Sequence, residues 1–196
     1  MTIGGSFSGV VASKVGYERA WLVFDGDSLT WMGAYPSECA AMVGKPYVNL
    51  AISGQTTYHI LSNTNTDLYG GLPANDTYIL WIGTNDLYAH TAPATIYANI
   101  VAIVAARAAA NFTPIFVCTL QDERDGEHYA DRSTLNALII AGAAANGYTV
   151  ADLAADARIG PEHASADPTY FIADMIHMTP AGLLIAADIV AAAILA

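Results

Sequence analysis

The chain has 196 residues, a length that suits one compact domain with a continuous core and is short for two. Hydrophobic residues make up 54% of it and charged residues only 13%, which argues against intrinsic disorder and predicts a surface poor in charge. The formal net charge of −11 excludes nucleic acids and anionic lipid surfaces as favoured partners. The scarcity of charge also favours the hypothesis that the protein forms a homo-oligomer.

Composition also limits the compartment and the cysteine chemistry. The most apolar segment, residues 181–196, is too short for a membrane span and contains Asp188. The N-terminus lacks the basic start and apolar stretch of a secretory leader, so a cytoplasmic location is the default expectation, and a secreted one if a leader has been removed. Cys39 and Cys118 have no suitably spaced partners, so we expect two free, buried thiols.

Short apolar runs alternate with longer segments of helical character along the chain. Residues 1–19 are rich in Gly and Ser and are interpreted as an arm or an extra edge strand, and residues 20–196 as the folded domain. Strands are predicted at 20–24, 47–51, 77–82, 115–120 and 149–151. Helices are predicted at 36–43, 57–63, 93–110, 129–145 and 180–195, several of them opening with proline.

Continuous apolar strands joined by helices indicate an α/β fold with a central parallel five-stranded sheet covered on both faces. In such a sheet the active groups gather beyond the carboxyl ends of the strands, where the connecting loops converge. Two long polar loops, 121–128 and 158–174, follow strands and are predicted to form the substrate rim.

Ser28 stands where the first predicted strand ends, after Gly26 and Asp27. A serine hydroxyl is a weak nucleophile unless a base takes its proton. His177, just before the last helix, could be that base, and Asp174 three residues earlier could orient its imidazole. These three residues are therefore the candidate catalytic triad.

Two further strand ends offer hydrogen-bond donors. Asn85 lies in the Gly-containing turn after the third strand, and Gly54 leaves its N–H unobstructed after the second. With the N–H of Ser28 they could form an oxyanion hole, in which one donor typically lowers the barrier by about 3–4 kcal/mol.

The motifs GDSLT (26–30), GTND (83–86) and DMIH (174–177), with Gly54 between the first two, resemble those of the SGNH, or GDSL, hydrolase superfamily. The resemblance covers about residue 20 to the C-terminus. It implies a flavodoxin-like, three-layer α/β/α sandwich and equates the family's catalytic Ser, Gly, Asn and His with Ser28, Gly54, Asn85 and His177. One departure is Asp25, where the family more often has a small or apolar residue.

The resemblance implies a serine esterase that works through an acyl-enzyme and needs no cofactor. We expect short acyl chains, and above all acetyl groups, on a small-molecule or carbohydrate ester. Alternatives within the family are a lysophospholipase, an aryl esterase or an acyltransferase. Outside enzymes, the alternative is an inactive carbohydrate-binding descendant. The α/β-hydrolase fold fits less well, because its nucleophile motif G-x-S-x-G would need glycine at Thr30.

Several residues have a plainer interpretation. Ser28 could be a helix N-cap, Asp27 is expected to bond to nearby backbone, and Asp86 to be a cap or turn residue. The substrate-binding candidates are Trp31, Tyr58, Tyr88 and His128, although such aromatic side chains more often complete a core. Because the histidines are scattered, no metal site is predicted.

Overall fold

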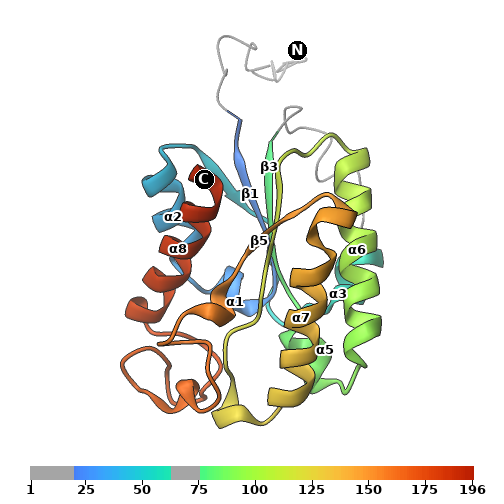
Figure 1. The fold of residues 1–196 in the computed structure, drawn as a ribbon. Coiled ribbons are helices and arrows are strands. Elements are labelled where there is room, and N and C mark those ends of the chain that lie inside the picture. The colour runs from blue at the N-terminus through green and yellow to red at the C-terminus, as the bar shows by residue number, and fades with distance from the viewer. Residues whose placement is uncertain (1–19, 63–75) are drawn as a thin grey trace, which may run out of the picture.

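A computed structural model describes residues 20–62 and 76–196, so the predicted N-terminal arm lies outside the described residues. Within them, parallel strands form one five-stranded sheet in the order β2-β1-β3-β4-β5 (Figure 1). The strands are β1 (Leu22–Gly26), β2 (Tyr47–Asn49), β3 (Thr77–Trp81), β4 (Ile115–Cys118) and β5 (Thr149–Ala151). The predicted parallel sheet is confirmed.

Helices cover both faces of the sheet. The longer ones are α2 (Tyr35–Val43), α3 (Thr57–Ser62), α6 (Pro93–Ala109), α7 (Tyr129–Asn146) and α8 (Pro180–Leu195). The α2 and α8 helices pack together on one face, and α3, α6 and α7 lie on the other (Figure 1). The α/β/α sandwich implied by the family resemblance is therefore confirmed.

One part of the core lies between β1, β3 and the α2 helix. Both strands are buried along their whole length, as expected for a sheet covered on two faces. Tyr35 packs edge-on against Phe24, with ring centroids 5.4 Å apart, and against Trp81 at 5.3 Å. This aromatic packing lies directly behind the ends of the strands that carry the site.

The predicted boundaries of these strands and helices agree with the structure to within two residues. Among the described residues, two short α-helices were missed, α1 (Ser28–Trp31) and α5 (Thr84–Tyr88). Each follows a central strand immediately and is only about one turn long, too short to show the periodicity by which a helix is recognised in sequence.

Two sequence predictions concern the membrane span and the cysteines. Across 20–62 and 76–196, no helix is long and apolar enough to cross a membrane. Cys39 and Cys118 are free and buried, as predicted. Burial raises the pKa of Cys39 to about 12 and that of Cys118 further still.

Candidate active site

The turn that presents Ser28 depends on the two residues before it. Gly26 ends β1 beside Trp81, and a Cβ atom at Gly26 would lie 2.2 Å from the Trp81 carbonyl oxygen. Asp27 is the N-cap of α1, because its Oδ1 accepts a hydrogen bond of 3.0 Å from the N–H of Leu29. Ser28 is thus the first residue of a helix and not its cap, and Asp27 has the backbone-bonding role predicted for it.

Ser28, His177 and Asp174 form one hydrogen-bonded series. The Oγ of Ser28 lies 2.8 Å from Nε2 of His177, and Nδ1 of His177 lies 2.6 Å from Oδ2 of Asp174. Because a carboxylate only accepts hydrogen bonds, a neutral His177 would carry its proton on Nδ1 and leave Nε2 as the acceptor for the serine hydroxyl. The structure brings these three residues together as predicted from the sequence.

Asp174 is held in its ionised form. Its Oδ1 accepts hydrogen bonds of 2.9 Å from the N–H groups of Ile176 and His177. Partial burial works to raise the pKa of Asp174, but the hydrogen bond from the His177 ring and these two backbone N–H groups outweigh it and lower that pKa. The carboxylate is therefore available to orient the imidazole near neutral pH.

Asn85 and Gly54 lie on adjoining segments. The Nδ2 of Asn85 donates a hydrogen bond of 2.9 Å to the carbonyl of Gln55, the residue after Gly54. Gly54 itself is exposed, with a φ of 79°, and the N–H of Ile52 in the same turn donates to the carbonyl of Gly26 at 3.2 Å. One N–H of Asn85 is thus engaged, so this side chain offers its other N–H to a ligand.

Asp86 bonds to the first residue of α3, which agrees with the cap role predicted for it and also joins two helices. Its carboxylate is buried and accepts hydrogen bonds from the N–H of Thr57 at 2.9 Å and from the Thr57 hydroxyl at 2.6 Å. Burial raises the pKa of Asp86, while these bonds from Thr57 lower it in part. The interaction ties α5, which carries Asn85, to the start of α3.

The four candidate substrate-binding residues fall into two groups. Tyr88 and His128 contact each other edge to face, with ring centroids 4.9 Å apart. The guanidinium of Arg124 lies 4.9 Å from the centroid of the Tyr88 ring. Trp31 and Tyr58 are instead 56% and 67% exposed, so neither completes the core. Trp31 ends the helix that Ser28 begins, and Tyr58 lies in the first turn of α3.

The prediction for the loop 121–128 was wrong in its first half. Gln121, Asp122 and Glu123 are fully buried, where an exposed substrate rim was expected. Burial raises the pKa of Glu123 to about 8. The charge of Arg132 lowers the pKa of Glu123 in part, and the charges of Asp122 and Asp27 raise it further. Burial also raises the pKa of Asp27 to about 7, although Leu29 and His177 lower it in part.

The negative charge of Asp25 is compensated within the core. Its Oδ2 accepts a hydrogen bond of 2.6 Å from the Tyr78 hydroxyl and lies 3.5 Å from Nη2 of Arg107. This departure from the usual family residue is therefore matched by a buried cation. A metal site finds no support in the described residues, which contain no group of three or more His, Cys, Asp or Glu able to hold an ion.

A three-layer α/β/α sheet with Ser28, His177 and Asp174 in hydrogen-bonded series at its carboxyl edge has the arrangement of a serine hydrolase. The model of the GDSL-like lipase/acylhydrolase family matches residues 15–183. The chain belongs to that family, and it is a carboxylic ester hydrolase of the SGNH, or GDSL, type.

Solved structures support the fold assignment. A GDSL-like lipase from Bacteroides thetaiotaomicron VPI-5482 is 25% identical, with a TM-score of 0.67 over 89% of this chain and 85% of that one. LAE5, an alpha/beta hydrolase enzyme from the metagenome of Lake Arreo, is 19% identical, with a TM-score of 0.71 over 89% and 94%. The acetyl xylan esterase AlAXEase is 18% identical, with a TM-score of 0.70 over 89% and 99%. No curated protein matches the sequence.

Proposed function

We propose that this hydrolase is a serine esterase that removes short acyl groups, above all acetyl groups, from small-molecule or carbohydrate esters. The observation that supports this proposal best is the continuous hydrogen-bonded series from the Ser28 hydroxyl through His177 to Asp174. A serine hydroxyl bonded to a correctly oriented neutral imidazole is the activated nucleophile of acyl transfer.

In the first half-reaction the Oγ of Ser28 attacks the ester carbonyl carbon while Nε2 of His177 takes the hydroxyl proton. Asp174 stabilises the imidazolium that forms, through the bond of 2.6 Å to Nδ1. The tetrahedral intermediate then expels the alcohol, which receives the proton from Nε2, and an acyl-enzyme remains on Ser28.

The oxyanion of the tetrahedral intermediate needs donors placed before the reaction. The candidates are the N–H groups of Ser28 and Gly54 and the amide N–H of Asn85 that Gln55 does not occupy. Because the Gln55 carbonyl fixes the orientation of the Asn85 amide, its second N–H has a defined direction. Such preorganised donors stabilise developing charge without a reorganisation cost.

In the second half-reaction water attacks the acyl-enzyme and gives its proton to Nε2 of His177. The bond between the acyl carbon and Oγ of Ser28 then breaks, Nε2 returns the proton to Oγ, and the carboxylic acid leaves. An alcohol in place of water would give acyl transfer instead, so adding a soluble alcohol and measuring ester products distinguishes an acyltransferase from a hydrolase.

The openness of the site supports a small acyl group on a larger alcohol. The side chains of His177 and Asp174 are 24% and 39% exposed, and Gly54 is exposed as well. An exposed site leaves room for a bulky alcohol such as a sugar, but it offers a long acyl chain little enclosed apolar surface to bury.

Hydrolysis of a chromogenic acetate ester by the purified protein tests the proposed function. Ser28→Ala and His177→Ala are each expected to lower kcat on the order of 10⁴-fold. Ser37→Ala, at a surface serine whose hydroxyl bonds to the Ala34 carbonyl, is the matched control and should keep the wild-type rate. A wild-type rate no higher than those of the Ser28 and His177 variants would favour the inactive carbohydrate-binding alternative.

Chain-length preference separates the proposed substrate class from its alternatives in the family. The wild-type protein is assayed on acetyl, butyryl and octanoyl esters of one leaving group. The proposal expects kcat/KM to be highest for acetyl. An octanoyl optimum would instead favour a lysophospholipase-like enzyme.

A further inference from the structure

A buried ion pair joins Asp122, in the segment after β4, to Arg132 on α7. Their Oδ1 and Nη2 atoms are 2.8 Å apart, and the two side chains are 0% and 2% exposed. Burial lowers the pKa of Arg132, and the neighbouring carboxylate of Asp122 raises it in part. Because desolvation offsets most of the attraction between two buried charges, such a pair contributes little net stability. Its main effect is to fix the position of the chain segments that it joins.

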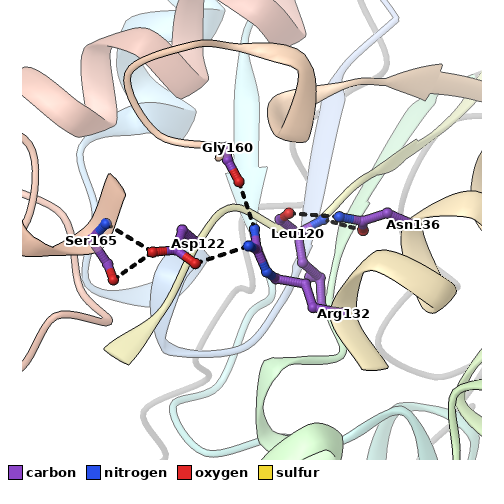
Figure 2. Close-up of polar contacts among 6 residues, drawn as sticks. All are labelled: Leu120, Asp122, Arg132, Asn136, Gly160 and Ser165. Atoms are coloured by element: carbon purple, nitrogen blue, oxygen red, sulfur yellow. Dashed lines mark hydrogen bonds and ion pairs between the residues drawn. The ribbon is translucent and has the colours of Figure 1, made fainter. Parts of the chain in front are cut away.

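The pair and Ser165 form a clamp that holds the segment 159–165 at two points, Gly160 and Ser165 (Figure 2). Nη1 of Arg132 donates a hydrogen bond of 2.9 Å to the carbonyl of Gly160. Oδ2 of Asp122 accepts bonds from the N–H of Ser165 at 2.9 Å and from its hydroxyl at 2.7 Å. The N–H of Asp122 also donates to the carbonyl of Ile159 at 2.8 Å.

The clamp has a rigid base in α7. One turn after Arg132, the Asn136 side chain forms two bonds of 2.8 Å with Leu120, one to its N–H and one to its carbonyl (Figure 2). These bonds hold α7 against the chain that leaves β4. The residues from Leu120 to Arg124 are therefore fixed relative to the sheet. The position of Ser28 is fixed relative to the same sheet, because Ser28 follows the end of β1.

This fixed segment reaches the loop that carries the candidate base. The N–H of Arg124 donates a hydrogen bond of 2.7 Å to the carbonyl of Met175, between Asp174 and His177. Both residues of this bond have positive φ angles, 42° for Arg124 and 56° for Met175. Side chains disfavour that conformation, so it persists only where surrounding contacts impose it.

The base of the same loop is closed by its own contacts. Phe171 and Met178 form an antiparallel bridge and are both buried, and the N–H of Ile172 donates to the carbonyl of His177 at 2.9 Å. These contacts hold the loop to the core at its base. The bond from Arg124 to Met175 sets the direction of its tip, and with it the position of the imidazole.

We propose that Asp122, Arg132 and Ser165 are positioning residues that hold the loop with Asp174 and His177 in register with Ser28. They act through the segments 122–124 and 159–165, without touching the reacting atoms. The inference rests on the proposed function for its effect on catalysis, but its structural part can be measured in an inactive protein.

Ser165→Ala tests the proposal most directly, because it removes the bond of 2.7 Å to Asp122 and leaves the backbone N–H bond in place. Asp122→Asn is the second variant and also weakens the contact with Arg132. The matched control is Tyr148→Phe, which removes a buried bond of 2.6 Å between the Tyr148 hydroxyl and the Ile139 carbonyl. Tyr148 lies just before the amino end of β5, at the opposite edge of the sheet from the site, and Ile139 lies on α7 beyond Asn136.

Two readouts are compared in all variants at a temperature where each is fully folded. Hydrogen–deuterium exchange of peptides covering 170–179 is expected to quicken at least tenfold in Ser165→Ala and Asp122→Asn, and to stay unchanged in Tyr148→Phe. The kcat for acetate ester hydrolysis is expected to fall about 10–100-fold in the first two variants with KM unchanged, in line with the sensitivity of reaction rates to small displacements.

Unchanged exchange of 170–179 in both clamp variants would overturn the proposal, as would a kcat loss no greater than that of Tyr148→Phe. If the wild-type protein hydrolyses no ester, the proposed function fails, and the exchange measurement still decides whether the clamp holds the loop.

Discussion

At the scale of single residues, Asp174 controls which nitrogen of His177 bears the proton. In Asp174→Asn the amide can turn its N–H toward Nδ1, which moves the imidazole proton to Nε2 and removes the acceptor for Ser28. We expect kcat to fall on the order of 10²–10⁴-fold with little change in KM. Steady-state kinetics on the acetate ester measure this, and a kcat within threefold of wild type would contradict the role given to Asp174.

Asn85 is expected to act mainly on the transition state. Asn85→Ala removes the amide donor and the bond to Gln55, so we expect kcat to drop about 10²–10³-fold and KM to change little. Asn111→Ala, at an asparagine just after α6 and remote from the carboxyl edge, is the control. An increase in KM with an unchanged kcat would show that Asn85 binds substrate without stabilising the oxyanion.

Glu123 makes folding stability depend on pH. A carboxyl whose pKa rises on folding keeps its proton in the native state after the unfolded chain has lost it. Since burial raises this pKa from the ordinary value of 4.5 to about 8, stability should fall as the pH rises between those values and then level off. Glu123→Gln lacks this titration. Its free energy of unfolding should therefore rise by about 2–4 kcal/mol relative to that of the wild type as the pH goes from about 5 to about 9.

Urea denaturation at pH 5, 7 and 9 measures the effect of Glu123→Gln. Glu38→Gln, at an exposed carboxyl in the first turn of α2, is the control and should follow the wild-type pH dependence. Parallel curves for wild type and Glu123→Gln would show that Glu123 is ionised in the folded protein at neutral pH.

The candidate triad could be predicted from sequence because its members occur in short motifs directly before or after strands and helices. The contacts that hold the triad could not. Asp122 and Glu123 lie in a polar stretch that is typical of an exposed loop, and their burial depends on Arg132 and Ser165, which are distant in sequence. Two of the seven basic residues, Arg107 and Arg132, are buried in ion pairs, and the sequence pattern does not show which of the seven these would be.

At the scale of secondary-structure elements, α8 approaches the loop before it closely. A Cβ atom at Gly182 would lie 2.3 Å from the carbonyl oxygen of Tyr170 and 3.0 Å from Cβ of Met178. Gly182→Ala should therefore push α8 away from the segment that carries His177. We expect it to lower the free energy of unfolding by about 1–3 kcal/mol, measured by urea denaturation.

Ala181→Ser, at the exposed neighbouring position of α8, is the control for Gly182→Ala and should change stability by less than about 0.5 kcal/mol. Equal stability of the two variants would mean that the loop moves aside without cost.

The main strands and helices were predictable because each has a clear length and hydrophobic pattern. The short helices α1 and α5 were not, because a single turn has no period to detect. Their formation depends on local bonding, such as the Asp27 cap, and on contacts between elements, such as Asp86 with Thr57. These same short helices carry Ser28 and Asn85, so the part of the fold closest to the chemistry was the part least visible in the sequence.

At the scale of the whole molecule, charge and exposed apolar area act in opposite directions on self-association. The net charge of −11 makes two copies repel each other, while Trp31, Met32, Ile52 and Tyr58 are each more than half exposed. Because salt screens the repulsion and leaves apolar contact intact, we expect a shift from monomer toward dimer as salt is raised. Sedimentation velocity at low and high salt measures it, and a monomer under both conditions would reject the homo-oligomer hypothesis.

The burial of both thiols has a practical consequence for studying this enzyme. Cys39 and Cys118 are the only cysteines in the chain, and each is inaccessible and has a pKa raised by burial, so neither reacts readily with alkylating reagents. A cysteine introduced at an exposed position such as Tyr58 would accept a fluorescent label selectively. Ligand binding could then be followed by fluorescence in the folded protein, without first replacing its two native cysteines.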